Sequence, residues 1–436
     1  MLKQEVLGSD DLLIFSSPLE RSVEKCCVGD NYLSCHEVDL NFKDFDQMKK
    51  SIKINGISLN FVRQVPPTGI VYKNQQGDEA VFSYNKMKKH LFGNINTYEG
   101  REFEIESCHN SHVIKEINLE NLGSKTPLTM PNISNPESSA ANRREDIDRS
   151  TEVTFSLKVY YTQEFEAVTA DIELFVDQMI SRTNLGFINS KIPVRVEAFC
   201  IEKATLSDAK GSDIYKFRIM KGSAVATLNT ADAATLLVRD APYCGVVTHA
   251  TPAERDWAFS VNKKGCIADY VLGHELGHNF GCYHDKKSYS NSPDVKNTMY
   301  PYGYGHHIEK GSQSKGALTI MAYYKRGYTM GHPGRGRARV NYYSNPSVIY
   351  PLTGTPTGVA GAANNAYVIT QNRFKMAAHG DESATCPGFI FTQLSSPSPS
   401  PKSQIQVQNP GPKSKSQIQV PNPKSKVKRT SMTFYD

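Results

Sequence analysis

Residues 274–285 read HELGHNFGCYHD, and the spacing of the histidines and the glutamate in this stretch indicates the fold around it. As part of a helix over 267–280, it places His274 and His278 on one face, one turn apart. Imidazole nitrogens held in this way suit a shared zinc ion. Glu275 lies about 100° around the helix from His274, close enough to reach a water beside that ion.

Two histidines do not complete a zinc site, and the next residues supply a third. Gly281 follows His278 by three residues and tolerates a positive φ, so it can end the helix in a left-handed turn. The chain then folds back and brings His284 toward the ion. Three protein ligands leave one position open for water, as in catalytic zinc sites. We therefore expect zinc on His274, His278 and His284, with Glu275 as the general base.

The full pattern HExxHxxGxxH resembles the signature of the metzincin zinc endopeptidases. Asp285, directly after the third histidine, is similar to the acid of the adamalysin (reprolysin) branch, which is buried and braces the loop below the zinc. Met321, in GALTIMAYYKRG, matches the methionine turn that lies under the metal in this group. The resemblance implies that Met321 forms a hydrophobic floor under the zinc and that Asp285 supports the zinc site without being a ligand.

The resemblance is closest to reprolysin-like peptidases of bacterial type, and it covers about 151–380. It implies the metzincin fold, of class α/β (α+β): a twisted five-stranded mixed sheet, an active-site helix and a smaller lower part after Gly281. Besides the central motif, it follows CGVVTH (244–249), YPYGYGH (300–306), TIMAYY (319–324), YYSNPSVIY (342–350), GTPTG (354–358) and AANN (362–365).

Tyr323 departs from the adamalysin pattern, in which a proline stands two residues after the methionine. The Met-x-Tyr arrangement is similar to astacins and serralysins, where the tyrosine swings near the zinc. Tyr323 therefore has two interpretations. Its hydroxyl could donate a hydrogen bond to the oxyanion, or it could be a packed tyrosine of the cleft wall.

Before this region, residues 1–120 show short alternating strand patterns at 56–62, 101–107 and 112–119, which predict a β-rich domain. Residues 121–150 are rich in Ser, Asn and Pro, and this composition is typical of a linker.

The region 151–380 alternates strands and helices. The patterns predict a strand at 151–162, a helix at 165–187, a strand at 193–202, and within 221–250 a helix leading to the strand YCGVVTHA. This alternation indicates a mixed sheet flanked by helices. Residues 381–436 contain a repeat, SQIQVQNPGPKSK and SQIQVPNPKSK, with almost no core-forming side chains, so we expect a disordered basic tail.

In front of a metzincin domain, the β-rich region resembles a propeptide. Cutting near Arg143-Arg144 in the linker would then release the enzyme. Several metzincin zymogens block their zinc with a propeptide thiolate, and Cys108 is the candidate for such a switch. His109 and His112 are alternative ligands, and a disulfide or a free thiol is the other interpretation of Cys108.

Nine cysteines, an odd number, leave at least one thiol without an internal partner. Cys244 and Cys266 resemble a disulfide of the reprolysin-like group, and such a bond favours an oxidising compartment. The first residues, MLKQEVLGSDDLLIFSSPLE, lack the basic and apolar regions of a signal peptide, so the natural start stays open. On the family and the disulfide we expect a secreted protein.

The net charge of +6 belongs to the tail, because residues 391–436 carry seven Lys and Arg residues against one Asp. The remainder is near neutral, which argues against a nucleic-acid partner. The sequence contains no run of eighteen apolar residues, so it does not predict a membrane-spanning helix. RGRAR (335–339) is typical of a solvated face. We expect a monomer that acts on proteins or peptides.

Two other classes of function stay open. One is a catalytically silent zinc protein that binds a protein partner through the cleft. The other is a structural or matrix-binding protein that acts through the repeated tail. The intact glutamate and ligand set favour a zinc-dependent endopeptidase, made as a zymogen.

Overall fold

The computed structural model describes residues 13–15, 25–27, 32–40, 42, 50–54, 56–118, 151–208, 216–217, 231–247, 258–289, 300–310, 312–323, 338–380 and 386. The predicted linker, 121–150, lies outside the described residues, as does the predicted tail apart from Cys386.

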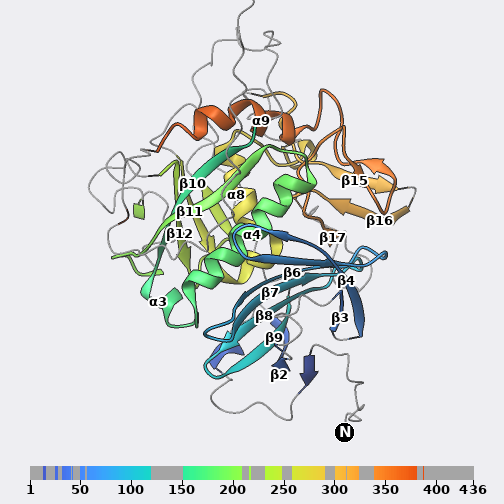
Figure 1. Cartoon of the computed structure of the whole chain (residues 1–436). Helices are drawn as coiled ribbons and strands as arrows, with labels where there is room; N and C mark the ends of the chain where they lie inside the picture. Colours follow the sequence, from blue (N-terminus) through green and yellow to red (C-terminus); the bar gives the residue numbers. More distant parts are fainter. Residues whose placement is uncertain are drawn as a thin grey trace, which may run out of the picture. The chain divides into compact units, whose positions relative to one another are not determined.

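The N-terminal part forms one antiparallel sheet, in the order β1-β2-β9-β8-β7-β6-β5-β4-β3 (Figure 1). Alternate residues of β2 to β9 pack into one core, with Leu59, Tyr72, Phe82 and Ile105 among its buried side chains. The β-rich N-terminal region is thereby confirmed. The strands are β1 (Leu13–Phe15), β2 (Tyr32–Leu40), β3 (Ser51–Ile54), β4 (Ile57–Val65), β5 (Gly69–Lys73), β6 (Glu79–Asn85), β7 (His90–Asn96), β8 (Glu102–Cys108) and β9 (Ser111–Ile117).

The second sheet has five strands in the order β11-β10-β12-β14-β13, and it confirms the predicted mixed sheet. Its strands run parallel except β13, which is antiparallel to β14 and forms one edge. Their bounds are β10 (Val153–Tyr161), β11 (Val194–Lys203), β12 (Ala233–Val238), β13 (Gly245–Val247) and β14 (Phe259–Lys263).

The helix predicted within 221–250 is wrong at AATLLV, which is the central strand β12. Every residue of β12 is buried, because β10 and β14 flank the strand and both faces of the sheet are covered. A short apolar run of this kind has no alternation that separates strand from helix.

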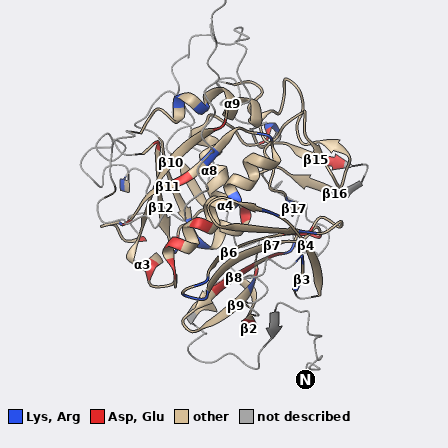
Figure 2. Cartoon of the chain, in the orientation of Figure 1, with Lys and Arg blue, Asp and Glu red and all other residues tan. Residues whose placement is uncertain are grey.

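The main helices of the second part are α3 (Gln163–Glu166), α4 (Ile172–Asn189), α8 (Val271–Asn279) and α9 (Asn365–Met376). The helix predicted over 165–187 is divided, because Asp171 takes an extended conformation and caps α4 by accepting from Leu174 N at 3.2 Å. Acidic residues lie in the first turns of α3 and α4 (red in Figure 2), where a negative charge is favourable at the positive end of a helix dipole.

The lower part after Gly281 is built from short pieces. They are the 3-10 turn η5 (Lys286–Tyr289), the sheet of β15 (His307–Lys310), β16 (Ser312–Leu318) and β17 (Ala338–Arg339), and the pair β18 (Ile349–Tyr350) and β19 (Thr355–Pro356). Two further 3-10 turns are η1 (Lys25–Cys27) and η4 (Lys264–Asp269). Residues 335–337 of RGRAR lie outside the described residues, and Arg339 departs from the predicted solvated face: it is only 6% exposed, because it is paired with Asp269.

Four disulfides join Cys26 to Cys108, Cys27 to Cys35, Cys200 to Cys386, and Cys244 to Cys266. The expected pair Cys244–Cys266 is therefore confirmed. The ninth cysteine, Cys282, is free and buried. Among the described residues, no helix combines the length and the apolar character needed to cross a membrane.

Candidate metal centre

Helix α8 presents His274 and His278 on one face, and each ring is oriented by a backbone carbonyl. His274 Nδ1 lies 2.8 Å from Ile320 O, and His278 Nδ1 lies 2.8 Å from Cys282 O. A carbonyl can only accept, so both Nδ1 atoms carry the proton and both Nε2 atoms keep their lone pair. This is the tautomer that a metal ion bound at Nε2 requires.

Gly281 ends α8 and turns the chain back. Its φ is +97°, a value that side-chain-bearing residues rarely adopt. The turn is closed by Gly281 N donating to His278 O and Cys282 N donating to Gly277 O, both at 2.9 Å. These bonds satisfy carbonyls at the helix end, and they direct the chain so that His284 meets the other two histidines.

The three Nε2 atoms converge on one point. They lie 3.0 Å (His274–His284), 3.2 Å (His274–His278) and 2.9 Å (His278–His284) apart. Nitrogens bound tetrahedrally to one zinc at 2.0–2.1 Å would be about 3.3 Å apart, so the residues present fit that ion. Burial is the main cause that lowers the pKa of all three imidazoles, which keeps them neutral, as metal ligands must be.

Glu275 is buried against the edge strand β13. Burial raises the pKa of its carboxyl to about 8, although Arg339 acts in the opposite direction. A Cβ added at Gly245 would overlap Glu275 Oε1, so only glycine lets the strand approach this carboxylate so closely.

Met321 and Asp285 support the histidines from below. Met321 is fully buried, and its sulfur occupies the space that a Cβ at Gly277 would take. Asp285 Oδ2 accepts from Tyr323 N at 3.0 Å and from Ser288 Oγ at 2.5 Å, and it lies 3.4 Å from His307 Nε2. The carboxylate therefore ties the loop after His284 to the methionine turn.

The pKa of Asp285 is lowered to about 2 by these partners. Burial alone would raise it, but the hydrogen bonds from His307, Ser288 and the Tyr323 backbone outweigh that effect. The Asp285 carboxylate is therefore charged at every ordinary pH.

Tyr323 lies beside the three histidines. Its ring is stacked on His284, with centroids 3.6 Å apart, and is parallel to His274 with centroids 5.8 Å apart. The side chain is partly exposed. Both sequence interpretations are compatible with this position, since a stacked ring can still present its hydroxyl to a substrate.

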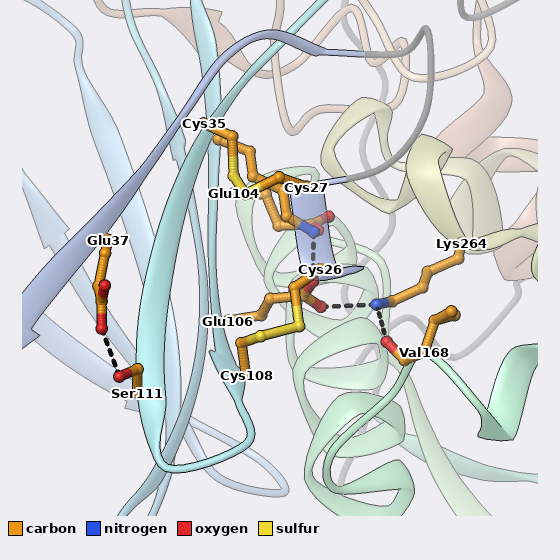
Figure 3. The surroundings of a disulfide bond; sticks show 11 residues. Cys26, Cys27, Cys35, Glu37, Glu104, Glu106, Cys108, Ser111, Val168 and Lys264 are labelled. Carbon is orange, nitrogen blue, oxygen red and sulfur yellow. Dashed lines mark hydrogen bonds and ion pairs between the residues drawn. A yellow bond between two sulfur atoms is a disulfide. The ribbon is translucent and has the colours of Figure 1, made fainter. Parts of the chain in front are cut away.

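Cys108 does not carry a free thiolate. It ends β8 and is bonded to Cys26 (Figure 3), so the structure contradicts its assignment as a zinc-blocking switch and supports the alternative of a disulfide. A sulfur held in a disulfide has no thiolate to offer a metal.

Sequence reasoning missed Gly245 and Arg339. Gly245 had a signal, since a glycine inside a strand pattern often marks the close approach of another group. Arg339 had none, because its partners Asp269 and Ala322 lie 70 and 17 positions away in the chain.

The comparison with known protein families agrees with this geometry. The family model of metallo-peptidase family M12 matches residues 151–344. A structure described as a chaperone-substrate complex is 14% identical, with a TM-score of 0.38, and the match covers 76% of this chain and 58% of that one. Metalloproteinase-II from Bacteroides fragilis is 10% identical, with a TM-score of 0.35, over 54% of this chain and 75% of that one. No curated protein matches the chain.

Proposed function

Because residues 151–344 belong to metallo-peptidase family M12, we propose that this metalloendopeptidase cleaves internal peptide bonds at a zinc ion held by His274, His278 and His284. The observation that carries the proposal is the convergence of three neutral Nε2 atoms beside the buried carboxyl group of Glu275. A bound zinc would lower the pKa of water and polarise the scissile carbonyl.

Glu275 acts as the general base. It follows His274 in α8, so its carboxylate lies next to the ligands without being one of them. It accepts a proton from the attacking water and later donates that proton to the leaving amine. Contact with Gly245 restricts the carboxylate to one side of the site.

Tyr323 donates its phenol proton in a hydrogen bond to the oxyanion that develops on the substrate. Its stacking on His284 holds the ring beside the metal position, and the Asp285 carboxylate fixes its backbone. Met321 supports α8 through the contact with Gly277.

The substrate backbone pairs with β13. This strand forms the edge of the five-stranded sheet, and Gly245 at its start faces Glu275. An extended peptide added to such an edge gains main-chain hydrogen bonds whatever its sequence, which suits protein substrates. Strand β14 lies between β12 and β13 inside the sheet, so it offers no edge to a peptide.

Replacing Glu275 with Gln tests the mechanism. We expect kcat/KM on a casein or peptide substrate to fall by about 1000-fold or more, because glutamine cannot accept the proton. Zinc content should stay unchanged, since Glu275 is not a ligand. The control is Glu197→Gln, an exposed glutamate of β11, which should keep full activity. Full activity in the Glu275 variant would refute the assigned base.

A chelator separates the enzyme from the silent zinc-binding alternative. Hydrolysis that stops with chelator and returns with zinc supports the peptidase. Absence of hydrolysis by zinc-loaded protein across a broad peptide library would favour a binding protein.

Processing and export belong to the same proposal. We propose that the chain is secreted, because four disulfides join described residues and such bonds persist in oxidising compartments. We also propose cleavage near Arg143-Arg144, which lies outside the described residues. N-terminal sequencing of active material should find a start after Arg144, alone or together with the start of the N-terminal piece; active material without any start after Arg144 would exclude this processing.

A further inference from the structure

Helix α4 is covered on two sides by elements from different parts of the chain. It contacts β11 and α8 of the peptidase, and also β4, β5, β6 and β7 of the N-terminal sheet. Polar side chains of α4 are bonded directly to that sheet. Gln178 Nε2 donates to Val81 O at 2.7 Å and to Asn94 Oδ1 at 3.2 Å. Asn184 Nδ2 donates to Pro66 O at 3.0 Å.

Apolar side chains join the same two parts. Phe92 of β7 meets Phe175 of α4 edge to face, with ring centroids 5.3 Å apart. Val65, Val71 and Val81 of the sheet form a buried cluster with Leu185 of α4. The N-terminal sheet therefore completes the peptidase core, and its removal would expose one side of α4 to water.

A buried ion pair crosses between the two parts at η4. Lys264 Nζ donates to Glu106 Oε2 and to Val168 O, each at 2.6 Å (Figure 3). The side chains of Lys264 and Glu106 are only 7% and 2% exposed. Glu106 is also paired with Lys115 of β9, so one carboxylate serves two buried ammonium groups. Removing one partner of such a buried pair leaves an uncompensated charge.

The same interface reaches the residues that begin the zinc-binding helix. Asn96 Nδ2 donates to Ala268 O at 3.3 Å, and Arg182 Nη2 donates to Asn96 Oδ1 at 3.0 Å and to Ala268 O at 2.8 Å. Arg182 also lies 4.4 Å from the ring centre of Tyr270. Tyr270 precedes α8 and has a φ of +60°, a conformation that its neighbours must hold in place.

None of the four disulfides joins the two parts, so the polypeptide link through 121–150 is their covalent connection. The disulfides Cys26–Cys108 and Cys27–Cys35 lie within the N-terminal part, and Cys200–Cys386 and Cys244–Cys266 lie within the peptidase. Buried ionisable side chains of both parts lie near each other: the sheet contributes Glu102, Glu104, Glu106 and Lys115, and the peptidase contributes Arg182, Lys264, Arg339 and Asp269. Burial raises the pKa of Glu102 and Glu104, so the ion pair that crosses between the parts is the one between Glu106 and Lys264.

We propose that the N-terminal sheet (32–118) is a lasting partner of the peptidase. After the linker 121–150 is cut, the two pieces stay together, and the bound sheet holds η4 and Tyr270 where α8 needs them. Cleavage of the linker then breaks the chain without separating the two pieces, and the active species contains both of them.

The experiment cuts the full chain at a recognition sequence for a site-specific protease, inserted within 121–150. The cut protein is analysed by size-exclusion chromatography, mass spectrometry and zinc content. We expect the two fragments to co-elute at the mass of the uncut protein, with the same zinc content and no gain in peptidase activity. Separation of the fragments on cutting, or a rise in activity as they separate, would overturn the proposal.

The crossing ion pair is tested by the variant Glu106→Gln in the cut protein. We expect the dissociation constant between the fragments to rise by about 100-fold or more, because Lys264 loses its charged partner. The matched control is Glu116→Gln on β9, whose exposed partner Arg101 belongs to the same sheet. Its effect should stay below about threefold.

Equal, small effects of the two variants would contradict the role of the Glu106–Lys264 pair. If Glu106→Gln does not fold, co-elution of the cut protein without that substitution still decides the proposal. Association is measured without substrate, so a protein that stays assembled but fails to hydrolyse peptides would refute the proposed function alone.

Discussion

Tyr323 is the residue whose role the sequence left most open, and its hydroxyl can be tested without disturbing its ring. In Tyr323→Phe, the stacking on His284 is kept and only the donor is lost. We expect kcat to fall by about 100-fold, the usual loss for one oxyanion donor, with KM and zinc content little changed. Steady-state kinetics and metal analysis check this. Unchanged kcat would leave Tyr323 as a packed side chain of the cleft wall.

Gly281 forms the turn that brings His284 to the other two histidines. Alanine at a φ of +97° is strained, so Gly281→Ala should lower the free energy of unfolding by about 1–2 kcal/mol and weaken zinc binding about tenfold. Denaturation and competition with a chromogenic chelator measure the two effects.

Gly354→Ala is the matched control for that substitution. Gly354 also has a positive φ, +65°, and an added Cβ there would meet nothing within 4 Å. It should lose similar stability and keep its zinc affinity. Equal zinc affinity in both variants would contradict the role given to the Gly281 turn.

At the level of elements, the contact between β13 and α8 sets the position of the general base. Gly245→Ala would push the Glu275 carboxylate aside, because the added Cβ overlaps Oε1. We expect kcat/KM to fall by about 100-fold while zinc remains bound, since displacement of a catalytic group by about 1 Å has an effect of that size. Peptide hydrolysis and zinc content are the measurements.

Val246→Ala is the control on the same strand, because successive side chains of a strand point to opposite faces. It should retain most of the activity. A Gly245 variant as active as the Val246 variant would show that Glu275 tolerates movement.

Elements whose sequence shows a clear period were predictable, and an element whose sequence shows none was not. Helix α8 was predicted from the four-residue spacing of its histidines, and β4, β8 and β9 were predicted from their alternation. Strand β12 has no alternation, since its neighbours in the sheet and the layers above and below bury all six residues. The division between α3 and α4 depends on one side chain, Asp171, which caps the second helix.

For the whole molecule, the metal centre should contribute to stability as well as to catalysis. Its three ligands come from α8 and from the chain beyond Gly281, so a bound ion links the two parts of the peptidase. Zinc at about 100 times its Kd would add about 2.7 kcal/mol, and a chelator should lower Tm by about 5–10 °C. Thermal unfolding with and without chelator measures this. In the variant His278→Ala, the chelator should not lower Tm any further. A wild-type Tm that stays the same with chelator would contradict the proposed metal site.

The N-terminal sheet shows why domain roles are hard to read along a chain. Its strands were predictable, but its position on α4 and η4 depends on pairs such as Glu106 and Lys264, which are 158 positions apart. The pairing of Cys108 with Cys26 is equally non-local, with 82 positions between them. The composition shows which residues are present, but it does not show which of them are in contact.

The sequence by itself predicted the proposed ligand set, the proposed general base and the turn between them, because all of these lie within eleven residues, where helix spacing and one glycine turn bring them together. Only the tertiary structure decided that Ile320 O orients His274, that Gly245 limits Glu275, and that the N-terminal sheet covers α4. Those contacts arise from packing between distant segments, where shape and burial select the partner and no local spacing signals it.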